Sequence, residues 1–298
     1  MVIHEGGTNM SIMSTLLAAG FEQKKKMSEA EAEQNLEEIL KAGEVATPAP
    51  KSLETRFEEA PAGGGVFYAN EETTAPYTVF YLHGGAYRAD FSRFHWAFLK
   101  RLIDATDAMV IAPAYRLVPF ATWEDAFDLI MPLWCDYVSA HPERKVILMG
   151  DSAGGGLSLA ITEKLKADGI RMADELILIS PWVDVAMDNP TIEAFTEVDP
   201  WLWPESLRVC GRSWAGEVGT NDWHVSPICG DLSGIGHVTL FTGTEEVLLP
   251  DSLRFFEKLD RNTDNKLIVG DGMMHVYPLM PIPEAHQAQQ EIFERVMR

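Results

Sequence analysis

The sequence predicts an α/β protein in which a mostly parallel β-sheet carries helices on both faces. Short apolar runs that are rich in β-branched residues alternate along the chain with amphipathic stretches of helical length. Parallel strands must be joined by crossover connections, so this alternation indicates helices packed on a sheet. With 298 residues, of which 46% are hydrophobic, the chain can bury one large core.

The expected elements follow one another in strand and helix order. Candidate strands are 78–82, 109–113, 146–149, 176–179, 238–241 and 266–269. Candidate helices are 94–105, 122–139, 155–166, 252–259 and 284–296. A charged helical stretch at 27–42 and an aromatic-rich region at 189–223 fall outside this alternation, and both could cover one end of the sheet.

Composition argues against several functional classes. The 45 acidic and 24 basic residues give a net charge of -21, which repels nucleic-acid phosphates and anionic membranes. The three cysteines form no Cys-x-x-Cys pair, so we expect no disulfide framework and no metal site. The apolar stretch 11–21 lacks a preceding basic segment, which favours a cytoplasmic protein. Residues 1–9 look like a disordered leader or an early start site.

The most informative stretch is the one around Ser152, "VILMGDSAGGGLSLAITEKL". An apolar strand enters a Gly-x-Ser-x-Gly turn and continues as a helix, a geometry that exposes a strained serine above the strand ends. Small residues at Gly150 and Gly154 allow the chain segments to cross there. Glycine-rich turns also bind phosphates, but no Gly-Lys-Ser/Thr follows, and Asp151 would repel a phosphate. The pattern therefore favours Ser152 as a nucleophile.

A nucleophilic serine needs a base, and donors for the developing oxyanion. His275 follows the last expected strand and is the candidate base. The stretch "YLHGGAY" places Gly84 and Gly85 directly after a strand, so their N–H groups, with that of Ala153, are candidate oxyanion donors. We expect His83 to hold this loop rather than to act as the base.

The base in turn needs a carboxylate to orient it. Glu245, Glu246 and Asp251 all follow a late strand and are candidates. Asp251 comes directly after Pro250 at an expected helix start, where a capping role is at least as reasonable.

These motifs resemble the hormone-sensitive-lipase-like branch of the α/β-hydrolases, bacterial esterase family IV. The resemblance spans roughly residues 65–298 and rests on His-Gly-Gly, Gly-Asp-Ser-Ala-Gly, "YRLVP" at 115–119, "EDA" at 124–126 and "SPWVD" at 180–184. It implies an α/β-hydrolase with an eight-stranded, mostly parallel sheet, helices on both faces and a helical cap. Residues 1–55 and 186–224 would contribute to the cap, and residues 56–298 would form the catalytic domain.

Carried over residue by residue, the resemblance makes Ser152 the nucleophile and His275 the base. The family usually has an aspartate in an Asp-x-Leu pattern, whereas this chain has Glu246-Val247-Leu248 at that place. Either carboxylate can accept the second N–H of the histidine, so Glu246 is favoured over Asp251 and Glu245. The third glycine of the family's loop is Ala86 here, which should leave both loop donors intact.

The expected activity is hydrolysis of small, short-acyl carboxylic esters through an acyl-enzyme, without a cofactor. The short-acyl expectation comes from the aromatic bulk of the 189–223 region. Two alternatives stay open: a non-catalytic small-molecule receptor on the same fold, and an amidase or peptidase that uses the same three residues. By resemblance, a homodimer could form through the sheet edge near the last strand.

Overall fold

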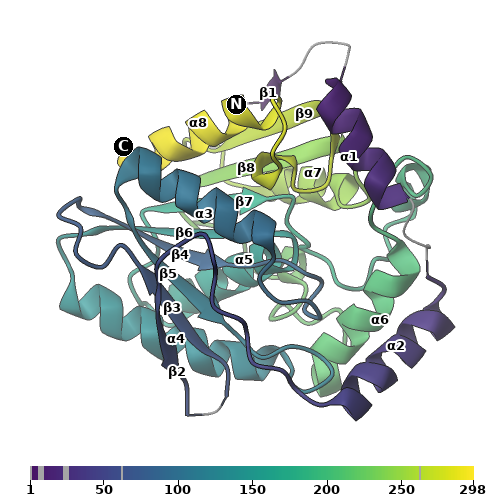
Figure 1. The fold of residues 1–298 in the computed structure, drawn as a ribbon, viewed down its shortest axis with the longest axis horizontal. Helices are drawn as coiled ribbons and strands as arrows, with labels where there is room; N and C mark the ends of the chain where they lie inside the picture. The colour runs from purple at the N-terminus through teal and green to yellow at the C-terminus, as the bar shows by residue number, and fades with distance from the viewer. Residues whose placement is uncertain (1, 6–9, 23–26, 62, 262) are drawn as a thin grey trace.

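A single β-sheet forms the centre of the molecule (Figure 1). The computed structural model describes residues 2–5, 10–22, 27–61, 63–261 and 263–298. In this part of the chain nine strands pair in the order β1-β9-β8-β7-β6-β4-β5-β3-β2. The strands are β1 (Val2–Glu5), β2 (Arg56–Glu59), β3 (Gly65–Ala69), β4 (Tyr77–Leu82), β5 (Met109–Ala114), β6 (Lys145–Asp151), β7 (Glu175–Ile179), β8 (Val238–Glu245) and β9 (Lys266–Met274). Only the pairings of β3 with β2 and with β5 are antiparallel.

The expected parallel sheet is confirmed, and its six expected strands correspond to β4 through β9. The expected number of eight strands is wrong, because β1 adds a ninth at the edge beside β9. Residues 2–5 were expected in a disordered leader, and they instead pair in parallel with β9, Val2 opposite Leu267 and Ile3 opposite Ile268. An uncovered edge of β9 would leave backbone N–H and C=O groups without partners, and β1 supplies them. Residues 1 and 6–9 lie outside the described residues.

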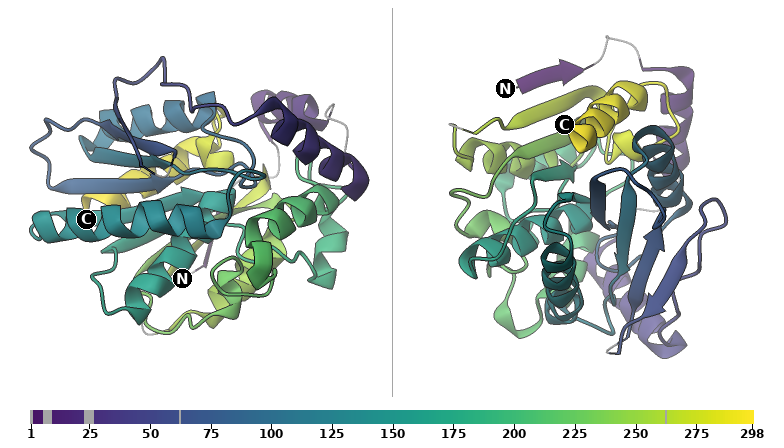
Figure 2. Two further views of the ribbon diagram at one scale, coloured as in Figure 1. Left: turned by 90° about the horizontal axis from the view of Figure 1, so that it is seen from below. Right: turned by 90° about the vertical axis from the view of Figure 1, so that its left-hand side faces the viewer.

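Helices cover both faces of the sheet (Figure 2). One face carries α3 (Arg93–Thr106) and α8 (Ala285–Met297), and the other carries α4 (Trp123–Ala140), α5 (Ser152–Ala167) and α7 (Leu249–Lys258). The alternation of side chains along β4 separates the two cores. Val79 and Tyr81 belong to the core under α3 and α8, while Phe80 and Leu82 belong to the core under α4 and α5. Burial on both faces explains why these strands are apolar throughout.

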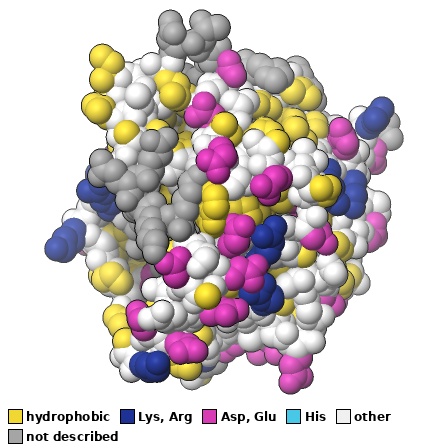
Figure 3. All heavy atoms as spheres, turned by 90° about the vertical axis from the view of Figure 1, so that its right-hand side faces the viewer, with side chains coloured by type: hydrophobic (Ala, Val, Ile, Leu, Met, Phe, Trp, Pro, Cys, Tyr) yellow, Lys and Arg dark blue, Asp and Glu magenta, His cyan; other side chains and the backbone are white. Residues whose placement is uncertain are grey.

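Three further helices lie together at one side of the sheet: α1 (Ile12–Glu22), α2 (Glu29–Ala42) and α6 (Pro204–Ala215) (Figure 1). Ser28 and Glu31 form a capping box that starts α2. Helix α2 packs against α6, and Arg212 of α6 forms an ion pair with Glu29 of α2. Figure 3 looks onto this side of the molecule, where acidic side chains outnumber basic ones and hydrophobic side chains gather near the middle. None of the described helices is both long enough and apolar enough to span a membrane.

Candidate active site

Ser152 lies at the sharp turn between β6 and α5. Its φ of 51° is in the left-handed region, which a non-glycine residue adopts only under strain. The flanking glycines are needed for close packing: a Cβ at Gly154 would lie 2.0 Å from the carbonyl oxygen of Leu82, and one at Gly150 would lie 2.3 Å from the carbonyl oxygen of Gly154. The sequence Gly-x-Ser-x-Gly thus permits a turn that larger residues would block.

Three of the candidate residues meet in one chain of hydrogen bonds. Nε2 of His275 lies 2.9 Å from Oγ of Ser152, and Nδ1 of His275 lies 2.6 Å from Oε2 of Glu246. All three side chains are buried, which strengthens the interactions of charged groups. A carboxylate, an imidazole and a hydroxyl in this order can move a proton from the serine to the histidine.

The other oxygen of Glu246 is held by three donors. Oε1 accepts hydrogen bonds from the hydroxyls of Ser180 and Thr242 and from the N–H of Gly243. The Ser180 hydroxyl also accepts the N–H of Val276, next to His275. Ser180 therefore connects the carboxylate to the loop that carries the histidine. The motif "SPWVD" contains it, but sequence analysis assigned it no role.

Asp251 does not take part in this chain. Its Oδ1 accepts hydrogen bonds from Asn189 at 2.8 Å and from Arg254 at 2.6 Å. It lies within α7, at the second position after the N-terminal residue Leu249. Of the three candidate carboxylates, Glu246 is the one that is hydrogen-bonded to His275.

The predicted oxyanion donors need one correction. The N–H of Gly84 donates to Oδ1 of Asp151 at 3.0 Å and is therefore engaged away from an incoming ester. Gly85 and Ala86 follow with positive φ values of 127° and 54°, and their N–H groups have no acceptor among the described residues. Ala153 is the second residue of α5, in the first turn, where N–H groups have no partner within the helix. Gly85, Ala86 and Ala153 thus offer free N–H groups near the turn.

Asp151 is the centre of a buried polar network beneath Ser152. It accepts the hydroxyl of Tyr81 at 2.6 Å as well as the Gly84 N–H, and Nε2 of His95 lies 3.3 Å from its Oδ2. Burial alone would raise the pKa of Asp151, but His95 and the two donors bring the pKa below its ordinary value. An ionised Asp151 can therefore hold the loop of residues 83–86, named here the oxyanion loop after its predicted role, against the turn.

His83 holds the same loop from the other side. Its Nδ1 lies 2.8 Å from the carbonyl oxygen of Gly84, and its ring stacks on Tyr115 with centroids 4.5 Å apart. Burial lowers the pKa of His83, which favours the neutral ring. These contacts fit the expectation that His83 supports the loop.

A pocket of about 400 Å³ opens over Ser152 and His275. Its walls are largely aromatic and aliphatic and come from the oxyanion loop, from the N-terminal segment and from the 189–223 region. Residues of the last two segments in the wall are Phe21, Met27, Pro200, Trp201, Leu202, Trp203, Ser206, Leu207 and Cys210. Trp201 stacks on Phe21 with centroids 4.3 Å apart and meets the His275 ring edge to face at 5.7 Å. The two segments outside the strand and helix alternation thus both border the pocket.

A buried carboxylate that sequence analysis missed connects this wall to the Glu246 loop. Asp199 accepts the N–H groups of Trp201 and Leu202 with Oδ1 and the N–H of Val247 with Oδ2. Burial raises the pKa of Asp199, whereas the nearby His275 and these N–H groups oppose the rise. Asp199 and Val247 are 48 positions apart in the chain, so no local pattern could reveal this contact.

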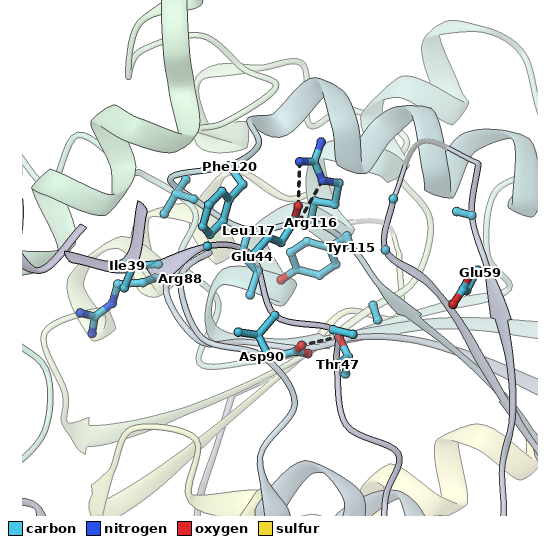
Figure 4. A pocket seen from close by; sticks show the side chains of 18 of the residues that line it. Ile39, Glu44, Thr47, Glu59, Arg88, Asp90, Tyr115, Arg116, Leu117 and Phe120 are labelled. Atoms are coloured by element: carbon cyan, nitrogen blue, oxygen red, sulfur yellow. Dashed lines mark hydrogen bonds and ion pairs between the residues drawn. The ribbon is translucent and has the colours of Figure 1, made fainter. Parts of the chain in front are cut away.

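A second cavity, of about 470 Å³, is lined in part by Tyr115, Arg116 and Leu117, which follow β5 (Figure 4). Residues 43–47, which follow α2, form part of its wall. Glu44 accepts hydrogen bonds from Arg116, and the Thr47 hydroxyl donates to Asp90. Arg88 and Asp90 border both this cavity and the pocket over Ser152. Within the described residues, no group of three or more His, Cys, Asp or Glu side chains is arranged to hold a metal ion.

The sequence matches a family model described as "alpha/beta hydrolase fold" over residues 79–279. An esterase of Acinetobacter venetianus is 30% identical over 229 residues, which cover 75% of each chain. Human hormone-sensitive lipase is 26% identical over 143 residues, 46% of this chain and 13% of that protein.

The fold agrees with these sequence matches. The crystal structure of an esterase from the bacterial hormone-sensitive lipase family has a TM-score of 0.81 and 22% identity, and the match covers 97% of this chain and 99% of that one. The chain belongs to the α/β-hydrolase fold family, and it is similar to esterases and to hormone-sensitive lipase within that family.

Proposed function

We propose that this ester hydrolase cleaves small carboxylic esters through an acyl-enzyme on Ser152, with His275 as general base and Glu246 as the acid that orients it. The observation that carries the proposal is the chain of hydrogen bonds from Ser152 Oγ through His275 to Glu246, at the base of a pocket large enough for a small ester.

The reaction proceeds by two acyl transfers. His275 removes the hydroxyl proton of Ser152 while Oγ attacks the ester carbonyl carbon, and a tetrahedral oxyanion forms. The protonated His275 then gives that proton to the leaving alkoxide, the C–O bond breaks, and the acyl group remains on Ser152. Water, deprotonated by His275, then attacks the acyl carbon, the C–Oγ bond breaks, and His275 returns the proton to Ser152 as the carboxylic acid leaves. Glu246 accepts the Nδ1–H of His275 and stabilises the imidazolium of both steps.

We assign stabilisation of the oxyanion to the N–H groups of Gly85 and Ala153, with Ala86 in the place first expected for Gly84. None of the three N–H groups has an acceptor in the described part of the chain, and Ala153 lies at the positive end of α5. Gly84 instead has a positioning role through Asp151.

We further propose that residues 1–55 and 186–224 contribute to a cap that limits the acyl chain, except for β1, which belongs to the sheet. Phe21, Trp201 and Trp203 supply bulky rings to a pocket of about 400 Å³. A wall of rigid rings limits the depth available to an acyl chain, so acetate and butyrate esters should be preferred over octanoate.

The test compares hydrolysis of p-nitrophenyl acetate, butyrate and octanoate by the purified protein and four variants. Ser152→Ala and His275→Ala should each lower kcat by roughly a thousandfold or more, and Glu246→Gln should lower it by a similar order. Asp251→Asn is the matched control, since its carboxylate bonds Asn189 and Arg254 instead of His275, and it should keep most of the activity.

Two results would contradict the proposal. Retention of activity by Ser152→Ala would exclude the acyl-enzyme on this serine. A larger loss of kcat in Asp251→Asn than in Glu246→Gln would show that Glu246 is not the residue that orients His275. Octanoate turned over faster than butyrate would overturn the acyl-length proposal alone.

A further inference from the structure

Among the described residues that line the pocket over Ser152, Arg88 is the one Lys or Arg side chain. Arg88 follows the oxyanion loop and borders this pocket together with Ser152 and His275. Nη1 of Arg88 donates to the amide oxygen of Asn35 on α2. Burial raises the pKa of the Cys210 thiol on α6, and the charge of Arg88 opposes this rise. Acidic side chains predominate on this side of the molecule (Figure 3), so a positive charge at the pocket is unusual among its surroundings.

Arg88 differs from other arginines nearby in having no carboxylate partner among the described residues. Arg116 pairs with Glu44 and Asp125, and Arg212 pairs with Glu29 and Glu33. The hydrogen bond that the structure gives to Arg88 goes to a neutral amide. A guanidinium has five N–H donors and can bind a carboxylate through two parallel hydrogen bonds. Arg88 therefore has further N–H donors with which it can bind an anion.

The nearest acidic residue in the loop, Asp90, is already engaged elsewhere. Its Oδ1 accepts the N–H of Phe91, and its Oδ2 accepts the hydroxyl of Thr47. In Figure 4 the two side chains diverge, with Arg88 directed toward Ile39 and Asp90 toward Thr47. Asp90 is thus held by the segment after α2 and does not neutralise Arg88 by an ion pair.

We propose that Arg88 is a specificity-determining residue and that the preferred substrates are small esters carrying a carboxylate besides the ester group to be cleaved. The proposal rests on the proposed esterase function and adds a substrate class to it. The carboxylate would bind Arg88 while the ester carbonyl lies against Ser152. Holding both ends of a small substrate fixes its orientation, and this should raise kcat/KM for the anionic ester.

Two pairs of esters test this, because the carboxylate could stand on the acyl or the alcohol side. For the acyl side, p-nitrophenyl hydrogen adipate is compared with p-nitrophenyl hexanoate. For the alcohol side, p-acetoxybenzoate is compared with its methyl ester. In each pair only one member is anionic, so the ratio of kcat/KM within a pair reports recognition of the charge.

In at least one pair the unmodified protein should favour the anionic member, and Arg88→Gln should lower kcat/KM for that member by about 10- to 100-fold. The neutral member should change much less, which also shows that the variant is folded. Arg88→Lys, which keeps the charge but loses the planar fork, should recover part of the ratio. Arg56→Gln removes one positive charge from the exposed strand β2 and is the control for the overall field of the protein.

A measurement on the unmodified protein avoids dependence on variants. Ionised benzoate should inhibit hydrolysis of p-nitrophenyl butyrate competitively and more strongly than benzamide does. Equal inhibition by benzoate and benzamide would overturn the role of Arg88. The same would follow if Arg88→Gln left the ratio of kcat/KM unchanged within both ester pairs. If the protein hydrolysed neither member of either pair, the esterase proposal itself would fail, a result distinct from active enzyme without charge preference.

Discussion

At the scale of single residues, Glu163 is a buried carboxyl group that forms no ion pair with any described Lys or Arg. It lies on α5, three turns after Ser152, with Oε1 lacking a hydrogen-bond partner and Oε2 against Gly230, where a Cβ would lie 1.8 Å away. Burial raises the pKa of Glu163 from 4.5 to about 8, although Lys166 and Lys258 oppose this. The folded protein therefore holds a proton that the unfolded chain has released at neutral pH.

This arrangement predicts a loss of stability with rising pH. Because the pKa is raised on folding, the native state binds more protons than the unfolded state between about pH 4.5 and pH 8, and the free energy of unfolding falls across that window. Glu163→Gln keeps the shape without the charge, so it should flatten the decline and stabilise the protein at pH 8 to 9 by a few kcal/mol, at about 1.4 kcal/mol per pKa unit. Urea unfolding at a series of pH values measures this.

Glu257→Gln, on the exposed surface of α7, serves as the comparison and should leave the pH dependence unchanged. A pH profile of Glu163→Gln that runs parallel to that of the unmodified protein would contradict the assignment. It would mean that Glu163 is ionised in the folded state.

At the scale of elements, the loop carrying Glu246 and the pocket wall carrying Trp201 are joined by Asp199. Each of its oxygens accepts backbone N–H groups, from Val247 on one side and from Trp201 and Leu202 on the other. Asp199 is therefore a positioning residue that fixes the acid loop and the Trp201 ring relative to His275.

Asp199→Asn replaces one acceptor oxygen with an N–H donor that would face an existing backbone N–H. We expect kcat to fall by about 10- to 100-fold, because a small displacement of the acid or of the Trp201 ring misaligns the reacting groups. The preference between acetate and octanoate esters should also weaken, since Trp201 borders the pocket. Steady-state kinetics with both esters measure kcat and KM separately.

The control for this prediction is Asp188→Asn, an exposed carboxylate of the same segment. A drop in thermal stability with kcat and acyl preference intact would assign Asp199 to folding alone and would refute the positioning role.

At the scale of the whole molecule, β1 closes the edge of the sheet beside β9. Its four residues pair in parallel with 267–270, and Ile3 packs against the core under α3 and α8. The homodimer expected through this edge stays a prediction, and β1 now occupies the strand edge that such a dimer would use.

Removal of residues 1–9 should therefore promote self-association. The deletion uncovers the N–H and C=O groups of β9, and an uncovered strand edge pairs readily with another chain. Light scattering coupled to size exclusion, at several concentrations, should give a larger mass for the deleted chain than for the full chain. Equal masses for both would show that β1 does not protect this edge.

The central strands and helices could be predicted from the amino-acid sequence alone. Strands β4 through β9 were predictable because their apolar runs are local and are buried on both faces, and the helices between them were predictable from amphipathic spacing. Local motifs also singled out Ser152 and, by chain order, His275, whereas the family resemblance favoured Glu246 among three carboxylates; the structure brings these three side chains within hydrogen-bonding distance. Their catalytic roles stay predictions.

The edge strands of the sheet and the hydrogen-bond partners of buried polar groups could not be predicted from the sequence and required the folded structure. Strand β2 is charged and exposed, and β1 is four residues long, so neither has the apolar run that marks a buried strand. The N–H of Gly84 donates to Asp151, Asp199 accepts the N–H of Val247, and Arg88 donates to Asn35, all of them contacts between residues far apart in the chain. Periodicity records which face of an element is buried, whereas a hydrogen-bond partner depends on what the fold brings opposite it.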